Sequence, residues 1–249
     1  MTDSLALFCF ACAGASAAPF QRWRRQAPPW LRIVPVERPG RGIRLGEPHV
    51  RTFEEIIRLL TREISRDLPQ NYALFGHSLG ALLAFGCAQE IRRRGLHPPK
   101  ALAVAGSAAP SRRDDSRLTS LSTDQDFINE LRRQCGTPEE IYASPELLRL
   151  ILDATAADFA VCASFQYRPM APLSIPVFIF GGRRDEIKEQ ALEAWRVETT
   201  ADTACDLFEG GHFFLREHEA EFLTMLTSRL KSTLENPLSE RESSLERRI

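Results

Sequence analysis

Short apolar runs alternate along this chain with longer stretches in which apolar residues recur every three or four positions. A short apolar run between turn residues is typical of a buried strand, and the longer period is typical of an amphipathic helix. The runs predict strands at residues 5–11, 32–36, 72–76, 101–105, 177–180 and 205–208. The helical patterns predict helices at residues 19–26, 53–67, 79–94, 188–199 and 217–234. This alternation favours a mostly parallel sheet with helices on both faces.

The helix expected at residues 53–67 shows the periodic pattern most clearly. Its apolar positions that share one face are Phe53, Ile56, Ile57, Leu60 and Ile64. Thr52 and Glu55 have the spacing of a capping box, which predicts that this helix begins just after Thr52.

Residues 111–168 interrupt the alternation, because they contain helical patterns and no convincing strand. An all-helical insertion between two strands of such a sheet predicts a lid over a site.

The last residues of the chain, 235–249, are polar and charged, and we expect a disordered tail there. The length of 249 residues then fits a single domain over residues 1–234 with the lid inserted.

Composition narrows the class of protein. The chain is 43% hydrophobic and 26% charged, as in ordinary globular proteins, and its net charge of -1 gives no attraction to nucleic acid or anionic membrane. No apolar run reaches the roughly 18 residues of a membrane span. Residues 5–19 end in small residues, as a signal peptide does, but no basic region precedes them, so we interpret them as the first core strand.

The six cysteines include a Cys-x-x-Cys pair at Cys9 and Cys12. No second pair follows at zinc-site spacing, and the pair lies at a strand rather than at the start of a helix. We therefore expect scattered buried thiols, no metal and no cofactor, in a cytoplasmic protein.

The pentapeptide GHSLG at residues 76–80 lies between an apolar run and a helical pattern. Gly-x-Ser-x-Gly in this context predicts a nucleophile elbow, a sharp and strained turn that exposes the serine hydroxyl at the end of a strand. Side chains in place of the two glycines would collide with neighbouring backbone, which an incidental turn would not explain. Ser78 is therefore the predicted nucleophile.

A serine hydroxyl needs a base to take its proton at neutral pH. Among the five histidines, His77 adjoins the nucleophile and is expected to point away from it, and His49 and His97 adjoin prolines in expected surface loops. His218 lies in a charged helical stretch. His212 follows the last expected strand in the sequence GGHFF, whose glycines let the loop carry the imidazole over the sheet edge. His212 is the predicted base.

The imidazole in turn needs an acid that fixes its tautomer. Asp185 ends the sequence FIFGGRRD after the penultimate expected strand, and Glu186 is the nearest alternative. The chain order Ser78, Asp185, His212 is that of α/β-hydrolases. The sequence therefore predicts the α/β-hydrolase fold, with its mostly parallel sheet between helices.

An oxyanion that develops during acyl transfer needs backbone N–H donors. One is expected from Leu79, the residue after the nucleophile. The other is expected from the small-residue loop after the first strand, where Ala13 is our choice and Gly14 or Cys12 are alternatives.

With these residues in place, the chain resembles the stand-alone (type II) thioesterases that accompany non-ribosomal peptide and polyketide synthetases. The similarity extends from about residue 5 to about residue 230. The segments that carry it are FACAGASAAPF at residues 10–20, ERPGRG at 37–42, GHSLGALLAF at 76–85, CGTP at 135–138, ADF at 157–159, FGGRRD at 180–185 and GGHFFL at 210–215. Ala11 and Ala15 replace a proline and a glycine of the family's first loop, and Arg183 stands where an acidic residue is frequent.

The resemblance implies hydrolysis of acyl thioesters on the phosphopantetheine arm of carrier proteins, which are transient partners, and so the removal of misprimed acyl groups or stalled intermediates. It implies no metal and no soluble cofactor. One alternative is a general small-ester or fatty-acyl hydrolase with the same triad, whose lid would seal an apolar pocket. Another is a non-catalytic carrier-binding scaffold, against which the intact triad argues. A terminal domain cut from a synthetase would have the same sequence features.

Arg38 and Arg41 are expected near the mouth of the site. Our hypothesis is that they assist docking of an acidic carrier protein or its phosphate, and the alternative is a pair of solvated surface arginines. We expect a monomer. Acyl preference and the synthetase served depend on lid and pocket shape, which a single sequence does not give.

Overall fold

The protein's computed structural model describes residues 4–134 and 136–235. Within these residues the strands form one sheet of order β2-β1-β3-β4-β5-β6, and neighbouring strands are parallel throughout. The strands are β1 (Leu5–Phe10), β2 (Leu31–Val36), β3 (Tyr72–His77), β4 (Leu102–Ala105), β5 (Val177–Gly182) and β6 (Thr203–Phe208). The predicted strands and the parallel sheet are confirmed, with strand ends shifted by a residue or two.

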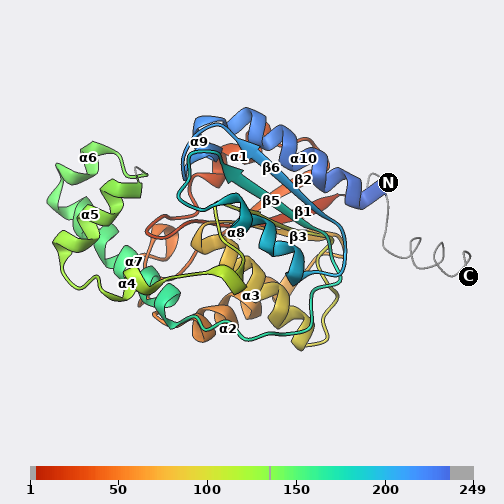
Figure 1. Cartoon of the computed structure of the whole chain (residues 1–249), viewed down its shortest axis with the longest axis horizontal. Coiled ribbons are helices and arrows are strands. Elements are labelled where there is room, and N and C mark those ends of the chain that lie inside the picture. Colours follow the sequence, from red (N-terminus) through yellow and green to blue (C-terminus); the bar gives the residue numbers. More distant parts are fainter. Residues whose placement is uncertain (1–3, 135, 236–249) are drawn as a thin grey trace, which may run out of the picture.

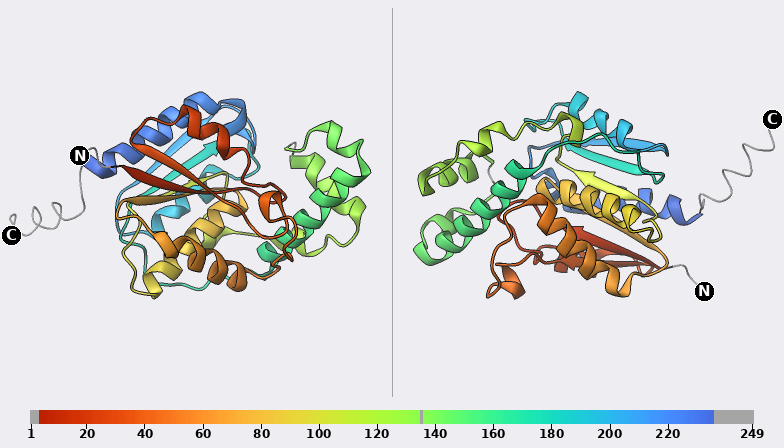
Figure 2. Two further views of the ribbon diagram at one scale, coloured as in Figure 1. Left: turned by 180° about the vertical axis from the view of Figure 1, so that it is seen from behind. Right: turned by 90° about the horizontal axis from the view of Figure 1, so that it is seen from below.

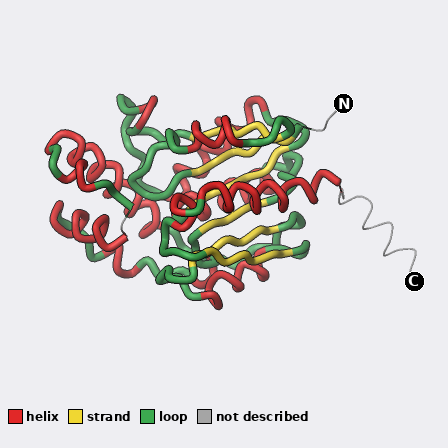
Figure 3. Tube along the Cα trace, turned by 90° about the horizontal axis from the view of Figure 1, so that it is seen from above, coloured by secondary structure: helices red, strands yellow, loops and turns green. Residues whose placement is uncertain are grey.

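Helices cover both faces of the sheet (Figures 1 and 3). One face carries α2 (Phe53–Ile64), α3 (Leu79–Arg93) and α8 (Glu189–Glu193). The other carries α1 (Phe20–Gln26), α9 (Phe214–Glu217) and α10 (Glu219–Glu235). Because successive strand side chains point to opposite faces, Leu74 packs toward α3 while Phe75 packs toward α1 and α10. A strand that is buried on both faces has apolar residues at consecutive positions, and this is why apolar runs in the sequence predicted these strands correctly.

Several helices end or divide differently from the prediction. Short 3₁₀ turns separate or extend them: η1 (Gly42–Arg44), η2 (Ser65–Asp67), η3 (Pro110–Arg112) and η4 (Ala194–Glu198). The helix expected at 188–199 is therefore α8 followed by η4, and the one expected at 217–234 is preceded by the separate short helix α9.

The capping box expected at Thr52 is wrong. The Thr52 side chain makes no capping hydrogen bond and is exposed. Instead, the Phe53 N–H donates to Oγ of Ser164, 2.8 Å away, at the end of a helix far along the chain. The free N–H group at the start of α2 is thus bonded to a residue distant in sequence, whereas the prediction had it bonded to the neighbouring Thr52.

Between β4 and β5 lies the helical insertion, which we define as residues 111–168. It contains α4 (Ser116–Thr119), α5 (Asp124–Gln134), α6 (Glu139–Tyr142) and α7 (Pro145–Ser164). Figures 1 and 2 show these green helices on the side where the strands end. The tail expected at residues 235–249 lies outside the described residues beyond Glu235. In the described ranges, no helix has the length and apolar character required to cross a bilayer.

Candidate active site

Ser78 lies at the sharp turn between β3 and α3. Its φ of 57° and ψ of -117° make it the one non-glycine residue with positive φ in the described part of the chain. A Cβ at Gly76 would collide with the Gly80 carbonyl, and a Cβ at Gly80 would collide with the Phe10 carbonyl. Both glycines are thus required by close backbone packing, as predicted, and the surrounding structure holds Ser78 in a strained conformation.

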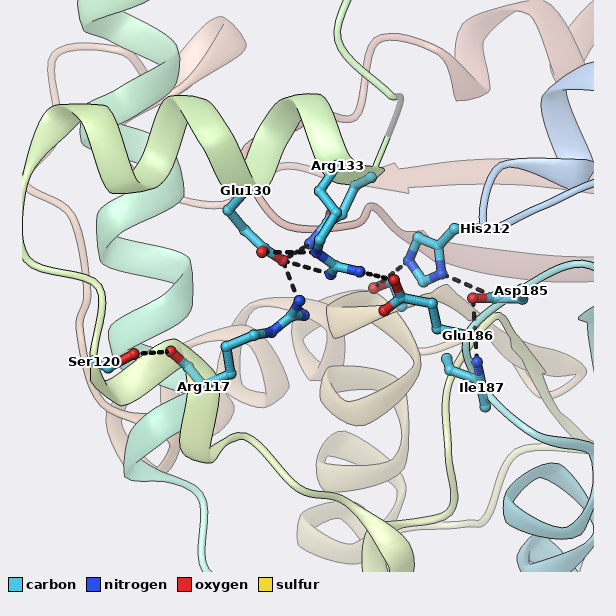
Figure 4. A network of polar contacts seen from close by, with 10 residues as sticks. Arg117, Ser120, Glu130, Arg133, Asp185, Glu186, Ile187 and His212 are labelled. Atoms are coloured by element: carbon cyan, nitrogen blue, oxygen red, sulfur yellow. Dashed lines mark hydrogen bonds and ion pairs between the residues drawn. The ribbon is translucent and has the colours of Figure 1, made fainter.

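The structure brings Ser78, His212 and Asp185 together at the carboxyl edge of the sheet. His212 Nε2 lies 2.9 Å from Ser78 Oγ, and His212 Nδ1 lies 2.9 Å from Asp185 Oδ2. Because a carboxylate only accepts, Nδ1 donates to Asp185 and leaves Nε2 free to accept from the serine hydroxyl. Figure 4 shows the imidazole oriented toward Asp185. This is the arrangement by which a serine is activated as a nucleophile.

Asp185 and Glu186 occupy different environments, although they are neighbours in sequence. The Asp185 side chain is only 5% exposed and also accepts from the Ile187 N–H at 3.4 Å. Glu186 is 69% exposed, and its carboxylate pairs with Arg133 of α5 (Figure 4). The geometry therefore favours Asp185 over the alternative acid.

His77 has a role that the sequence interpretation missed. It is 2% exposed, and its Nε2 donates to the His212 carbonyl at 2.9 Å. The two imidazole rings are 5.1 Å apart. Burial lowers the pKa of His77 well below its usual value, and the nearby His212 lowers it further, so the ring is neutral. The sequence signal for this role is the position of His77, a polar residue at the end of an apolar strand and directly before the nucleophile.

Ala13 and Leu79 line the same cavity as Ser78 and His212. Leu79 is the first residue of α3, so its N–H has no intrahelical acceptor. The Ala13 N–H also donates to no acceptor in the described part of the chain. Both residues therefore border the cavity with N–H groups that have no hydrogen-bond acceptor in the described part of the chain.

Arg38 and Arg41 are not at the surface, so both sequence interpretations of them are wrong. Their exposed fractions are 4% and 6%. Arg38 Nη2 donates to Asp158 Oδ2 on α7 at 2.9 Å, and Arg41 Nη1 contacts the same oxygen. Asp158 thus joins the insertion to the segment after β2, because its carboxylate contacts both arginines of that segment.

The cavity beside Ser78 has a volume of about 410 Å³, and the insertion supplies much of its wall. Leu118 and Phe159 contribute apolar surface, whereas Arg113 and Asp115 form an ion pair of 2.8 Å. Further charged groups line it, including Arg117 and Arg133, both paired with Glu130 (Figure 4). A wall with this many ion pairs differs from the sealed apolar pocket of the general hydrolase alternative.

The five cysteines among the described residues take no part in the hydrogen-bonded chain Ser78–His212–Asp185. Cys9, Cys12, Cys87 and Cys162 are buried free thiols, as predicted, and Cys205 is half-buried. Burial raises the pKa of both Cys9 and Cys12, which disfavours their thiolates. Cys135 lies outside the described residues. Within those residues, no group of three or more His, Cys, Asp or Glu side chains is arranged to hold a metal.

Comparison with known proteins settles the family. Residues 6–230 match the Thioesterase domain family. The chain belongs to the thioesterase family. It is 34% identical over 231 residues to the gramicidin S biosynthesis protein GrsT of Aneurinibacillus migulanus, covering 92% of this chain and 90% of GrsT. It is 33% identical over 233 residues to thioesterase PikA5 of Streptomyces venezuelae, covering 93% of this chain and 83% of PikA5.

Solved structures agree with this assignment. The thioesterase RedJ from prodiginine biosynthesis in Streptomyces coelicolor superimposes with a TM-score of 0.83 at 33% identity, covering 90% of this thioesterase and 89% of RedJ. ClbQ from the colibactin pathway gives a TM-score of 0.86 at 28% identity, covering 92% of this thioesterase and 98% of ClbQ. The α/β-hydrolase fold and the thioesterase resemblance are therefore confirmed, and this thioesterase is a thioester-hydrolysing enzyme.

Proposed function

We propose that this thioesterase is an editing, type II enzyme that removes acyl groups from the phosphopantetheine arm of synthetase carrier proteins. The observation that carries the proposal is the hydrogen-bonded chain Ser78–His212–Asp185 at a cavity that the helical insertion walls. The family relationship supports it, since the type II thioesterase BorB of the borrelidin cluster has a TM-score of 0.83 at 31% identity.

In the first half of the reaction, Ser78 Oγ attacks the thioester carbonyl while His212 Nε2 takes its proton. Asp185 holds the imidazole by Nδ1 and stabilises the imidazolium that forms. The Ala13 and Leu79 N–H groups donate to the tetrahedral oxyanion. Collapse of this intermediate breaks the C–S bond, and His212 returns the proton to the departing phosphopantetheine sulfur.

In the second half, water replaces the thiol in the site. His212 removes a proton from the water as it attacks the acyl-serine carbonyl, and the same two N–H groups hold the second oxyanion. Ser78 leaves with the proton from His212, which releases the free acid and restores the enzyme. The steps use only side chains, backbone N–H groups and water.

The partners in this proposal are acyl carrier domains, which bind transiently and bring their own phosphopantetheine. We place the reaction in the cytoplasm, because the cysteines of the described residues are free thiols. The monomeric state expected from the sequence stays a prediction.

The decisive experiment compares three substrates that share one acyl group: the acylated holo carrier protein, the thioester of a small thiol, and an oxygen ester. We expect kcat/KM to be much higher for the carrier protein. Equal or faster turnover of the two small substrates would favour the general hydrolase alternative instead.

Ser78→Ala serves as the blank in that comparison. We expect it to fold normally and to lose turnover of all three substrates. Turnover close to wild type would remove the triad from the mechanism. Retained carrier binding by an inactive wild-type enzyme would support the scaffold alternative.

A further inference from the structure

Ala13 lies between two peptide units that a single buried ion pair holds. The first unit contains the Cys12 carbonyl and the Ala13 N–H, and the second contains the Ala13 carbonyl and the Gly14 N–H. Arg38 Nη2 donates to the Cys12 carbonyl at 2.8 Å, and Asp158 Oδ2 accepts from the Gly14 N–H at 2.8 Å. Arg38 Nη2 also donates to Asp158 Oδ2, 2.9 Å away, which closes the ion pair.

This arrangement fixes the direction of the Ala13 N–H. A trans peptide unit is planar, and its N–H points opposite to its carbonyl. The Arg38 guanidinium therefore sets where the Ala13 N–H points by holding the Cys12 oxygen on the other side of the same unit. A cation on a peptide carbonyl also polarises the unit and strengthens its N–H as a donor.

The guanidinium holds the rest of this loop as well. Nη1 donates to the Ala11 carbonyl at 2.7 Å, and Nη2 reaches the Ala15 carbonyl at 3.2 Å. Arg38 thus contacts three carbonyls of the segment 11–15. A planar guanidinium can serve several acceptors in fixed directions, which a lysine ammonium cannot.

Asp158 comes from α7, so the insertion takes part in holding the loop. Gly14 has a φ of 71°, and a Cβ there would meet the Thr155 side chain, which also belongs to α7. The Gly14 backbone therefore packs directly against this helix. Arg41 supplies a second cation to Asp158 but makes no hydrogen bond to the loop in the described structure.

We propose that Arg38 and Asp158 are positioning residues of the oxyanion hole, which act by orienting the Ala13 N–H from the far side of its peptide unit. The proposal rests on the proposed function, because it takes Ala13 as an oxyanion donor. It assigns to α7 a part in transition-state stabilisation in addition to its part in the cavity wall. Neither side chain touches the substrate in this arrangement.

The test uses Arg38→Lys and Asp158→Glu, which keep the buried charges balanced. Arg44→Lys is the matched control: Arg44 lies on the same segment and donates to the Glu37 carbonyl at 3.0 Å, but it does not contact the loop. Each purified full-length variant is assayed with one small-thiol thioester for kcat and KM. Circular dichroism and thermal unfolding check the fold.

The distinguishing readout is inhibition by a trifluoromethyl ketone with the same acyl chain. Ser78 adds to its carbonyl to give a hemiketal oxyanion, so its affinity measures the oxyanion hole directly. We expect both test variants to lose kcat by about tenfold to hundredfold with KM little changed, because a donor is misplaced rather than removed. The inhibition constant should rise by a similar factor, and Arg44→Lys should match the wild type in all three values.

Wild-type kcat and inhibition in a folded Arg38→Lys or Asp158→Glu variant would overturn the proposal. So would a loss of kcat without weaker ketone binding, since that pattern indicates a purely structural role. If Arg38→Lys fails to fold, Asp158→Glu decides alone. Activity of Ser78→Ala in the same assay would instead defeat the proposed function, so the two failures are distinguishable.

Discussion

His77 donates a hydrogen bond of 2.9 Å to the backbone carbonyl of His212, so the residue before the nucleophile holds the residue that carries the base. The Ser78 hydroxyl and the His212 carbonyl are thereby fixed to the same end of β3. The distance between nucleophile and base then depends on one short segment of backbone rather than on the flexibility of the loop after β6.

We predict that His77→Ala lowers kcat by about threefold to tenfold, the effect expected for a single hydrogen bond worth about 0.5–1.5 kcal/mol. The loop that carries His212 loses its anchor, whereas Ser78 and Asp185 are unchanged. Steady-state kinetics with a small-thiol thioester measures this. His97→Ala is the control, because His97 packs against Tyr72 at the opposite end of β3 from His77. An equal loss of kcat in that variant would contradict the anchoring role.

His77 should also make the stability of the protein depend on pH. Burial lowers its pKa in the folded protein, so the unfolded chain binds the proton first as the pH falls below the ordinary value of 6.5. The stabilising effect is present above that pH and is lost as the pH falls. Between pH 7.5 and pH 5.5 the wild type should lose more free energy of unfolding than His77→Gln, whose amide does not titrate, and the extra loss is at most about 1.4 kcal/mol, the limit for a histidine that takes up its proton only in the unfolded chain.

Urea unfolding of both proteins at the two pH values measures this difference. Titration of other groups is common to both chains and cancels in the comparison. Parallel losses of unfolding free energy in the wild type and in His77→Gln would show that His77 is not buried in its neutral form.

Asp185→Asn and Glu186→Gln separate the two candidate acids. Asp185→Asn should reduce kcat by about 10⁴-fold, because an amide can stabilise the wrong imidazole tautomer and cannot stabilise the imidazolium. Glu186→Gln breaks only an exposed pair with Arg133, so its kcat with a small thioester should stay near wild type. The reverse order of the two effects would assign the acid to Glu186.

Gly80→Ala should destabilise the protein by about 1–3 kcal/mol or more, because its Cβ meets the Phe10 carbonyl, which belongs to a central strand and cannot move aside. Gly46→Ala is the control, since a Cβ there meets no atom within 4 Å. Chemical denaturation measures both variants. Equal stability of the two would mean that the turn tolerates a side chain.

The sheet and the order of the site residues could be predicted because each depends on a local signal. Buried strands such as 177–180 read as apolar runs, and the loops after them contain Ser78, Asp185 and His212 in recognisable surroundings. Because the strands are parallel, the loops at their carboxyl ends lie at one edge of the sheet, so their proximity can be predicted without knowing any long-range contact. The hydrogen bonds among the three residues then follow from the topology.

The contacts that could not be predicted join segments distant in sequence. Ser164 caps α2 across 111 positions, and Asp158 binds Arg38 across 120 positions. A single sequence gives residue type and spacing but not which partner reaches a buried group. The sequence therefore predicts Arg38 and Arg41 at the surface, where most arginines lie, although the fold buries both.

Asp158 also limits how this enzyme can be re-engineered. A chimera that grafts another thioesterase's lid onto this scaffold, in order to change the acyl chain accepted, would remove the carboxylate that Arg38 and Arg41 share. Two uncompensated cations would then be left in the interior of the recipient, which is strongly destabilising. Lid exchange therefore requires a donor with an acidic residue at this helical position, or the grafted segment must end before α7.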